Sequence, residues 1–357
     1  MIRRPKRDRV ARLNGLMRAE GIASFLVTRR EDVRYLSGFT GSAGSLLISA
    51  GRQYLVTDFR YELQAKDEAK GLATVLIQKK DHFTALKLAS ERLGVNDVWF
   101  DESALTVENV KKLKQQKLTL RGCRDLVGVL RLRKDAQELV LIKRAIMRAE
   151  ESFLELQRSV IPGATERDLG MKLEYLMREK GSRKAAFDTI VASGKNGAMP
   201  HAAVTNRRIR KGDLITFDFG AEADGYFSDI TRTVCVGRPS ARQREIHGLV
   251  LKAQTAAIRS IRPGVSCRTI DDAARAIITG EGLGKNFRHG TGHGIGLMVH
   301  EGPSLSPLSP DSIDKDMVFT VEPGIYIPGW GGVRNEDMVQ VTGNGVRVLT
   351  TLPAGLD

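Results

Sequence analysis

The chain has 357 residues, of which 41% are hydrophobic and 27% charged, and its formal net charge is +14. The length predicts two domains, and the balanced composition excludes an intrinsically disordered protein. An apolar run long enough to span a membrane and the apolar core of a secretory signal are both absent, and the three cysteines are few and widely spaced, so we expect a reduced, cytoplasmic protein without disulfide bonds.

The excess positive charge lies mainly in the first third of the chain. Residues 1–125 hold 24 Lys and Arg against 15 Asp and Glu, whereas the rest of the chain holds 32 against 27. A basic stretch such as residues 111–114 is compatible with nucleic-acid binding, but it is also typical of a solvated surface. Charge is the only feature that supports nucleic-acid binding, so we do not expect nucleic acid as a partner. We expect no membrane partner either.

The first third predicts an α/β domain. Short apolar runs punctuated by glycines predict strands, and two segments with helical spacing predict helices over residues 82–93 and 106–116. The expected strands cover residues 25–27, 46–48, 53–57, 75–77 and 98–100. Alternation of strands and helices predicts a sheet covered by helices.

A long helix is predicted over residues 135–159, where apolar residues recur mostly every three or four positions. The pattern therefore changes near residue 125. We place the domain boundary there, which gives an N-terminal domain over residues 1–125 and a C-terminal domain over residues 126–357.

The second domain contains an internal repeat. The segments 162–181 and 263–282 both run from a proline to a glycine with equal spacing, and the segments 211–218 and 315–322 both run from a lysine to an acid. A second acid follows in each copy. A pseudo-twofold arrangement of the copies would bring four acids together across one cleft: Asp218, Asp229, Glu322 and Glu336.

These four acids point to a metal site. Asp218 and Glu322 each lie in an otherwise apolar strand, where an ionised acid is costly unless it is paired or bound to a cation. The simpler interpretation pairs each acid with a nearby arginine, such as Arg232 or Arg334. Four converging carboxylates would repel one another, however, and a divalent metal is the usual remedy.

Histidines add to this pattern. Four of the six histidines are His201, His289, His293 and His300, and the last three share one glycine-rich window. Glycine at that density argues against a helical pair of metal-binding histidines. Several carboxylates with an imidazole suit Mn²⁺, Co²⁺ or Zn²⁺, and five such side chains can hold two ions. The other two histidines, including His247, are expected at the surface.

Seven motifs in order resemble the Xaa-Pro peptidases, aminopeptidase P and prolidase, of the creatinase/methionine aminopeptidase superfamily with the pita-bread fold. Residues 32–44 and 57–61 also resemble the amino-terminal domain of that family. The resemblance implies an α+β fold, in which a smaller α/β creatinase-like domain precedes a pita-bread domain with a pseudo-twofold repeat. The seven motifs lie at residues 196–201, 216–220, 228–233, 289–296, 299–301, 322–326 and 334–336.

The resemblance also implies two divalent metal ions, with Mn²⁺ the first choice and Co²⁺ or Zn²⁺ the alternatives. Asp229 and Glu336 would bridge the ions, Asp218 would complete one site, and His293 with Glu322 would complete the other. A hydroxide bridging the ions would attack the carbonyl ahead of proline, and Glu322 would shuttle the proton.

Five further residues match functional positions of the family. His201, His289 and His300 match histidines that bind the substrate and the transition state. Tyr326 and Arg334 match positions that orient the metal-binding carboxylates.

The function expected from the sequence is a cytoplasmic, homodimeric Xaa-Pro aminopeptidase acting on proline-containing peptides. The form of the motifs at 196–201 and 292–296 favours this reading, although Ala202 stands where some relatives have a second histidine. An Xaa-Pro dipeptidase (prolidase) is the alternative, and it must hold the carboxylate of proline. The sequence does not show which arginine, if any, would do so. A non-catalytic binding module with the same fold is a more distant alternative.

Overall fold

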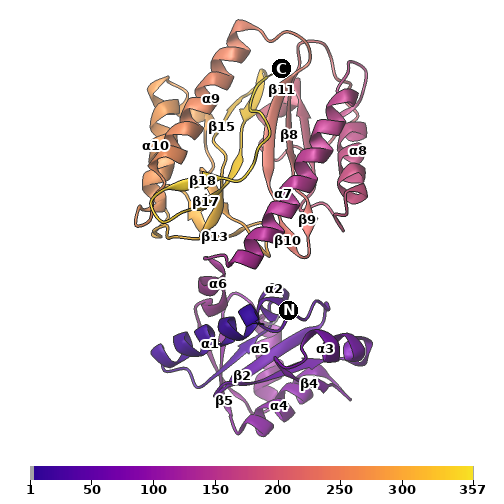
Figure 1. Ribbon diagram of the computed structural model, residues 1–357, viewed down its shortest axis with the longest axis vertical. Coiled ribbons are helices and arrows are strands. Elements are labelled where there is room, and N and C mark those ends of the chain that lie inside the picture. The colour runs from indigo at the N-terminus through magenta and orange to yellow at the C-terminus, as the bar shows by residue number, and fades with distance from the viewer. Residues whose placement is uncertain (1–3, 357) are drawn as a thin grey trace. The chain divides into compact units, whose positions relative to one another are not determined.

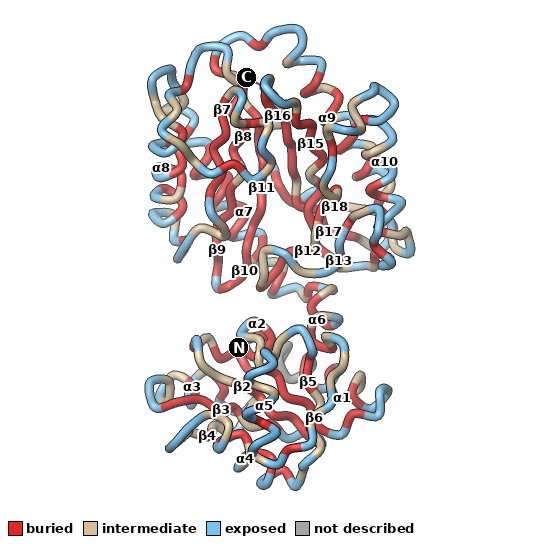
Figure 2. The backbone as a smooth tube through the Cα atoms, turned by 180° about the vertical axis from the view of Figure 1, so that it is seen from behind, coloured by how far each residue is buried: buried red, intermediate tan, exposed pale blue. Residues whose placement is uncertain are grey.

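The computed structural model describes residues 4–356, with side chains from residue 8 onward. The chain divides into two compact units, Met1–Arg131 and Leu132–Asp357. Each unit has its own buried core, and the buried segments follow its strands and the inner faces of its helices (Figure 2). Among the described residues, no helix is both long enough and apolar enough to cross a membrane.

The first unit is built on a mixed six-stranded sheet in the order β4-β3-β2-β1-β5-β6. Strands β1, β2 and β3 pair antiparallel, and the remaining pairings are parallel. The strands are β1 (Ser24–Val27), β2 (Gly44–Ser49), β3 (Arg52–Thr57), β4 (Thr74–Ile77), β5 (Asp97–Asp101) and β6 (Thr119–Cys123). The helices are α1 (Arg4–Ala19), α2 (Arg30–Ser37), α3 (Glu62–Glu68), α4 (His82–Leu93), α5 (Val107–Gln115) and α6 (Leu126–Arg131). All five predicted strands and both predicted helices are present, which confirms the α/β reading.

A partly buried charge cluster joins parts of the first unit that are distant in sequence. The Arg29 guanidinium lies 3.1 Å from Asp32, 2.7 Å from Asp101 and 2.6 Å from Asp125. Arg131, at the end of α6, donates to Asp32 at 2.7 Å. Burial raises the pKa of Asp32 to about 6. The three aspartates lie close enough to bind a metal ion, but Arg29 already supplies their positive charge.

The second unit consists of two sheets and two hairpins with helices packed on them. One sheet has the order β11-β8-β7, the other has the order β13-β12-β14-β17-β18, and the hairpins are β9-β10 and β15-β16. The strands are β7 (Ile190–Ser193), β8 (Leu214–Phe219), β9 (Glu222–Ala223), β10 (Tyr226–Phe227), β11 (Ile230–Cys235), β12 (Gly292–Gly294), β13 (Glu301–Leu305), β14 (Val318–Val321), β15 (Gly324–Ile327), β16 (Gly331–Arg334), β17 (Asp337–Val341) and β18 (Val346–Val348). The helices are α7 (Ala136–Leu156), α8 (Glu166–Glu179), α9 (Ala241–Ser260) and α10 (Cys267–Gly280).

The internal repeat read from the sequence is present in this unit. Each half has two helices that pack together, α7 with α8 and α9 with α10 (Figure 1). In the first half β8 pairs antiparallel with β7 and β11, and in the second half β14 pairs antiparallel with β12 and β17. In each half, an equivalent backbone hydrogen bond closes the turn after the first helix. Gly163 N donates to Ile209 O in the first half and Gly264 N donates to Ile313 O in the second, both at 2.9 Å.

Helix α7 fixes which face of β8 is buried. Asp135 caps its N-terminus in a capping box, as expected for a helix that starts at this point. Phe153 on α7 packs against Phe217 and Phe219 of β8, with ring centroids 5.3 and 5.0 Å apart. Because side chains alternate along a strand, Asp218 between these two phenylalanines projects to the opposite face.

Candidate active site

A cavity of about 850 Å³ in the second unit brings together nearly all of the site residues predicted from the sequence. Tyr326 alone does not line the cavity, but it contacts two residues that do. The predicted residues that line it are His201, Asp218, Asp229, His289, His293, His300, Glu322, Arg334 and Glu336.

The four acids lie in or next to equivalent strands of the two sheets, as expected from the repeat. Asp218 lies in β8 opposite Thr231 of β11, and Asp229 directly precedes β11. In the second half, Glu322 directly follows β14 and Glu336 directly precedes β17. The antiparallel pairs β8–β11 and β14–β17 therefore each place two acids side by side, as the sequence repeat predicts.

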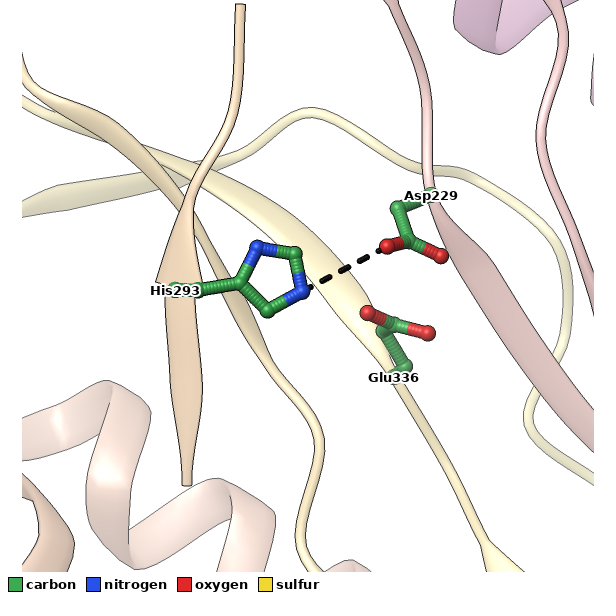
Figure 3. Close-up of side chains that lie close together, drawn as sticks. All are labelled: Asp229, His293 and Glu336. Carbon is green, nitrogen blue, oxygen red and sulfur yellow. Dashed lines mark ion pairs between the residues drawn. The ribbon is translucent and has the colours of Figure 1, made fainter. Parts of the chain in front are cut away.

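Three of these residues form the tightest group. One ligand atom from each of Asp229, His293 and Glu336 lies within 4.8 Å of the others. In Figure 3 the His293 imidazole, carried by β12, points toward the carboxylates of Asp229 and Glu336, which directly precede β11 and β17. His293 Nε2 is 3.5 Å from Asp229 Oδ2 and 3.4 Å from Glu322 Oε1. The group has the size and composition of a site for a cation.

The electrostatics of the cluster also fit a cation. Burial raises the pKa of Asp218, and burial together with the neighbouring acids raises the pKa of Asp229 and Glu336 well above the usual range. Asp218 Oδ1 and Glu336 Oε1 are buried without a hydrogen-bond partner. Buried oxygens of this kind need a partner, and a divalent metal coordinated by them would supply it.

The simpler interpretation, in which arginines neutralise the acids, holds only for Asp218. Arg334 Nη2 donates to Asp218 Oδ2 at 2.7 Å, whereas Arg232 pairs with Asp337 instead, also at 2.7 Å. Within residues 4–356, no lysine or arginine forms an ion pair with Asp229 or Glu336. The negative charge at the centre of the cluster is therefore left for another cation.

Thr231 connects the two halves of the cluster; it lies within the motif at residues 228–233, but the sequence assigns it no role. Its hydroxyl accepts a hydrogen bond from Arg334 Nε at 3.0 Å and donates to Glu336 Oε2 at 2.7 Å. Arg334 thus orients Asp218 directly and Glu336 through Thr231. The signal in the sequence is the spacing of two between Asp229 and Thr231, which places both side chains on one face where the strand begins.

Tyr326 links Arg334 to His289. Burial raises the pKa of Tyr326 to about 12, so its hydroxyl keeps its proton. The hydroxyl accepts from Arg334 Nη1 at 2.7 Å and lies 2.9 Å from His289 Nε2. His289 Nδ1 is 2.8 Å from Gly290 O, which can only accept, so Nδ1 carries the proton and Nε2 accepts from Tyr326. Burial lowers the pKa of His289 and keeps this ring neutral.

We expect Tyr326→Phe to lower about 10-fold the rate of the peptide hydrolysis that the sequence predicts, because loss of this hydroxyl releases both His289 and Arg334 from their shared partner. The free energy of unfolding should fall by about 2 to 4 kcal/mol, because two buried hydrogen bonds are lost and one of them involves a charged guanidinium. Steady-state kinetics and urea denaturation measure the two effects. An unchanged rate in the folded variant would mean that the contact has no part in catalysis.

The loop that carries His201 is held by a buried carboxylate. Glu166, the first residue of α8, is 0% exposed. It accepts hydrogen bonds from Ser193 N at 2.8 Å, Asn196 Nδ2 at 3.0 Å and Thr205 N at 3.2 Å. These donors lie on both sides of His201, so Glu166 fixes the ends of the loop. His201 itself is exposed and faces the cavity.

The remaining histidines divide into two groups. The centres of the His300 and His293 rings lie 4.2 Å apart, and the His300 side chain is exposed at the cavity. The expectation that His247 lies at the surface is wrong, because His247 is buried on α9. His82 is partly buried and contacts Ser45 Oγ at 2.9 Å. Neither His82 nor His247 lines the cavity.

Comparison with known proteins gives matches over both units. Metallopeptidase family M24 matches residues 140–343, and the creatinase/prolidase N-terminal domain matches residues 9–133. An Xaa-Pro dipeptidase of Pyrococcus furiosus is 37% identical, over 96% of this chain and 98% of its own length.

Two solved structures show the same extent of similarity. The Xaa-Pro dipeptidase from Bacillus anthracis is 38% identical with a TM-score of 0.95, and the match covers 98% of this chain and 99% of that one. The X-Pro aminopeptidase from Thermotoga maritima is 38% identical with a TM-score of 0.90, covering 97% and 98%. The predicted combination of a creatinase-like domain and a pita-bread domain is therefore confirmed.

Proposed function

Because this chain belongs to metallopeptidase family M24, we propose that it is an Xaa-Pro dipeptidase, which hydrolyses the bond ahead of proline in dipeptides. The observation that carries the proposal is the buried cluster of acids around His293, with two carboxylate oxygens that lack a hydrogen-bond partner. Relatives named Xaa-Pro dipeptidase that match over almost the whole chain support this reading better than the aminopeptidase reading that the sequence favoured.

Membership of this family implies divalent metal ions, and the cluster fits them. The ligands we assign are Asp218, Asp229, His293, Glu322 and Glu336. Carboxylates with one imidazole form a mostly hard ligand set, for which we propose two Mn²⁺ ions, with Co²⁺ or Zn²⁺ as alternatives. When bound, such ions supply a Lewis acid that polarises the peptide carbonyl and lowers the pKa of water.

The other residues then have distinct tasks. Glu322 lies at the edge of the cluster, 3.4 Å from His293 Nε2, where its carboxylate would take a proton from water and pass it to the proline nitrogen that leaves. His201 and His300 are exposed to the cavity and would donate hydrogen bonds to the substrate and to the developing oxyanion. Both nitrogens of His289 are already engaged, so we assign this ring to the wall of the substrate pocket.

One observation favours an Xaa-Pro aminopeptidase as the second candidate. Among the described residues that line the cavity, Arg334 is the only lysine or arginine. Its guanidinium is already engaged, with Thr231 at Nε, Tyr326 and Pro200 O at Nη1, and Asp218 at Nη2. A dipeptide places its C-terminal carboxylate next to the scissile bond. The described residues that line this cavity offer that carboxylate histidines and hydroxyl groups but no uncommitted lysine or arginine. A longer peptide has no such requirement.

Comparison of Ala-Pro with Ala-Pro-Ala-Ala separates the two candidates. For the Mn²⁺-loaded protein we expect kcat/KM for Ala-Pro to exceed that for the tetrapeptide about 10-fold or more, because a site built for the proline carboxylate loses this contact when the chain continues. Chromatography of the released alanine measures both reactions; the second product is proline from Ala-Pro and Pro-Ala-Ala from the tetrapeptide. Ala-Ala serves as the control substrate.

Faster cleavage of the tetrapeptide would assign the chain as an aminopeptidase. If neither peptide is cleaved with Mn²⁺, Co²⁺ or Zn²⁺, both assignments fail, and a binding module with the same fold becomes the better description. Elemental analysis of the purified protein then shows whether that module still holds metal.

A further inference from the structure

The segment that carries His289 and His293 has little rigidity of its own. A Cβ atom at Gly292 would lie 2.0 Å from Thr320 O, and one at Gly294 would lie 1.8 Å from Gly302 O, so both positions require glycine. Glycine loses more conformational freedom on folding than any other residue. Contacts from outside the segment must therefore hold the two histidines in place.

One such contact comes from Asp271 on α10, whose residue exposure is 0%. Asp271 Oδ1 accepts hydrogen bonds from Thr291 N at 3.0 Å and from Thr291 Oγ1 at 2.8 Å. Its carboxylate also forms a two-pronged pair with Arg275, at 2.7 and 2.9 Å. The buried carboxylate is thus neutralised and at the same time attached to the glycine-rich segment two residues after His289.

Arg275 holds the segment on the other side. Its Nη1 donates to Phe287 O and its Nη2 donates to His289 O, both at 2.8 Å. The guanidinium carbon also lies 4.3 Å from the centre of the Phe287 ring, and that ring meets the His289 ring edge-on at 5.1 Å. The planar guanidinium with its fixed fork of donors can make all these contacts at once, which an ammonium group cannot.

We propose that Asp271 and Arg275 act together as a positioning pair that fixes His289 in the wall of the substrate pocket. Neither side chain lines the cavity, so the pair acts through other residues. It also reaches the acid cluster, because Thr291 O accepts a hydrogen bond from Glu322 N at 2.8 Å. The inference rests on the proposed function, since it assigns a task within that site.

The purely structural reading is an ordinary ion pair between helix neighbours four residues apart, as is common on exposed helix faces. Such a pair contributes little beyond a few tenths of a kcal/mol and makes no contact with a functional loop. Here the aspartate is fully buried, and four further hydrogen bonds run from the pair to residues 287–291. These contacts distinguish a positioning role from surface charge pairing.

The test uses Arg275→Lys and Asp271→Asn in the Mn²⁺-loaded, full-length protein. Arg275→Lys keeps the charge but loses the fork, and Asp271→Asn keeps the shape but loses the charge. We expect kcat for Ala-Pro to fall about 10- to 100-fold in each, with little change in KM, as for other residues that orient a site. Combined with His289→Ala, each change should lower kcat by much less than it does alone, because the pair then has no ring to position and keeps only its link to Glu322 through Thr291.

The matched control is Arg131→Lys in the first unit, where Arg131 forms a buried ion pair with Asp32. This variant should lose thermal stability but keep kcat. A parental kcat in folded Arg275→Lys and Asp271→Asn, or losses that multiply with that of His289→Ala, would overturn the positioning role.

A measurement that needs no substrate tests this inference independently of the proposed function. Hydrogen–deuterium exchange of residues 287–294 should be faster in Arg275→Lys than in the parent protein and unchanged in Arg131→Lys. If the parent cleaves no Xaa-Pro peptide, the proposed function fails, and the exchange result still decides whether the pair orders the segment. Equal exchange rates in the parent protein and in Arg275→Lys would overturn the positioning role of the pair.

Discussion

Asp229→Ala is expected to lower kcat/KM for Ala-Pro on the order of 10³-fold or more. Asp229 lies at the centre of the tightest group, with His293 and Glu336 within 4.8 Å. Its loss removes a carboxylate that we assign to metal binding, and a bound metal stabilises the charge of the transition state by several kcal/mol, or about a tenfold rate change per 1.4 kcal/mol. Kinetics and elemental analysis together measure the loss of activity and of metal.

The same substitution should leave the metal-free protein as stable as the parent or more so. Burial and the neighbouring acids raise the pKa of Asp229, which shows that its ionised form is disfavoured in the metal-free site. A loss of activity without a loss of stability would therefore identify Asp229 as a functional residue. Asp272→Asn, at an exposed acid on α10, serves as the control and should change neither property. Full activity with normal metal content in Asp229→Ala would refute the ligand assignment.

The sequence contained enough information to predict how the four acids come together. Asp218 and Glu322 occupy equivalent places in two copies of one strand pattern, and strands alternate strictly between faces. Once the repeat is recognised, a symmetric pairing of β8 with β11 and of β14 with β17 follows, and the acids must share one cleft. The cavity lined by all four residues agrees with that prediction.

The residues that hold the site in place were much harder to predict. Glu166 and Asp271 appear in the sequence as ordinary acids near the start of a helix, and the spacing of Asp271 and Arg275 is that of a solvent-exposed helical pair. What distinguishes them is which loop packs against each helix, and that is a tertiary contact. His247 illustrates the same limit, because a histidine among the charged residues of α9 gives no local sign of burial.

Helix α1 and the choice of substrate length show two other limits. Six of the first nine residues are charged, so the N-terminal part of α1 shows little apolar periodicity, and the sequence does not predict this helix.

The motifs that suggested an aminopeptidase surround the reacting centre, where both kinds of enzyme need the same groups. The difference lies in what surrounds the residue beyond the scissile bond, and short motifs do not describe that region.

The metal-free protein is expected to become less stable as the pH rises. The folded, metal-free protein raises the pKa of Asp218, Asp229 and Glu336 above their ordinary values of 3.8 and 4.5, chiefly through burial. Above about pH 4, the folded state therefore binds more protons at these sites than the unfolded chain does. By linkage, this contribution to stability is largest at acidic pH and is lost as the pH rises through the raised pKa values. The melting temperature of EDTA-treated protein should thus fall as the pH is raised from acidic values through neutrality and beyond.

Metal binding should oppose this trend, because the ligands must be deprotonated to bind and the ion replaces the lost protons. With Mn²⁺ at about 100 times its Kd, we expect the melting temperature at neutral pH to rise by about 5 to 10 °C, and by less at pH 5. Differential scanning calorimetry of the EDTA-treated and Mn²⁺-loaded protein measures the difference at each pH. Asp229→Ala removes one of the raised groups, so it should flatten the pH dependence of the metal-free protein and reduce the gain from Mn²⁺. A metal-free melting temperature that rises steadily from pH 5 to 8, with no gain from any of the three metals, would show that the buried acids are stabilised by protein contacts alone.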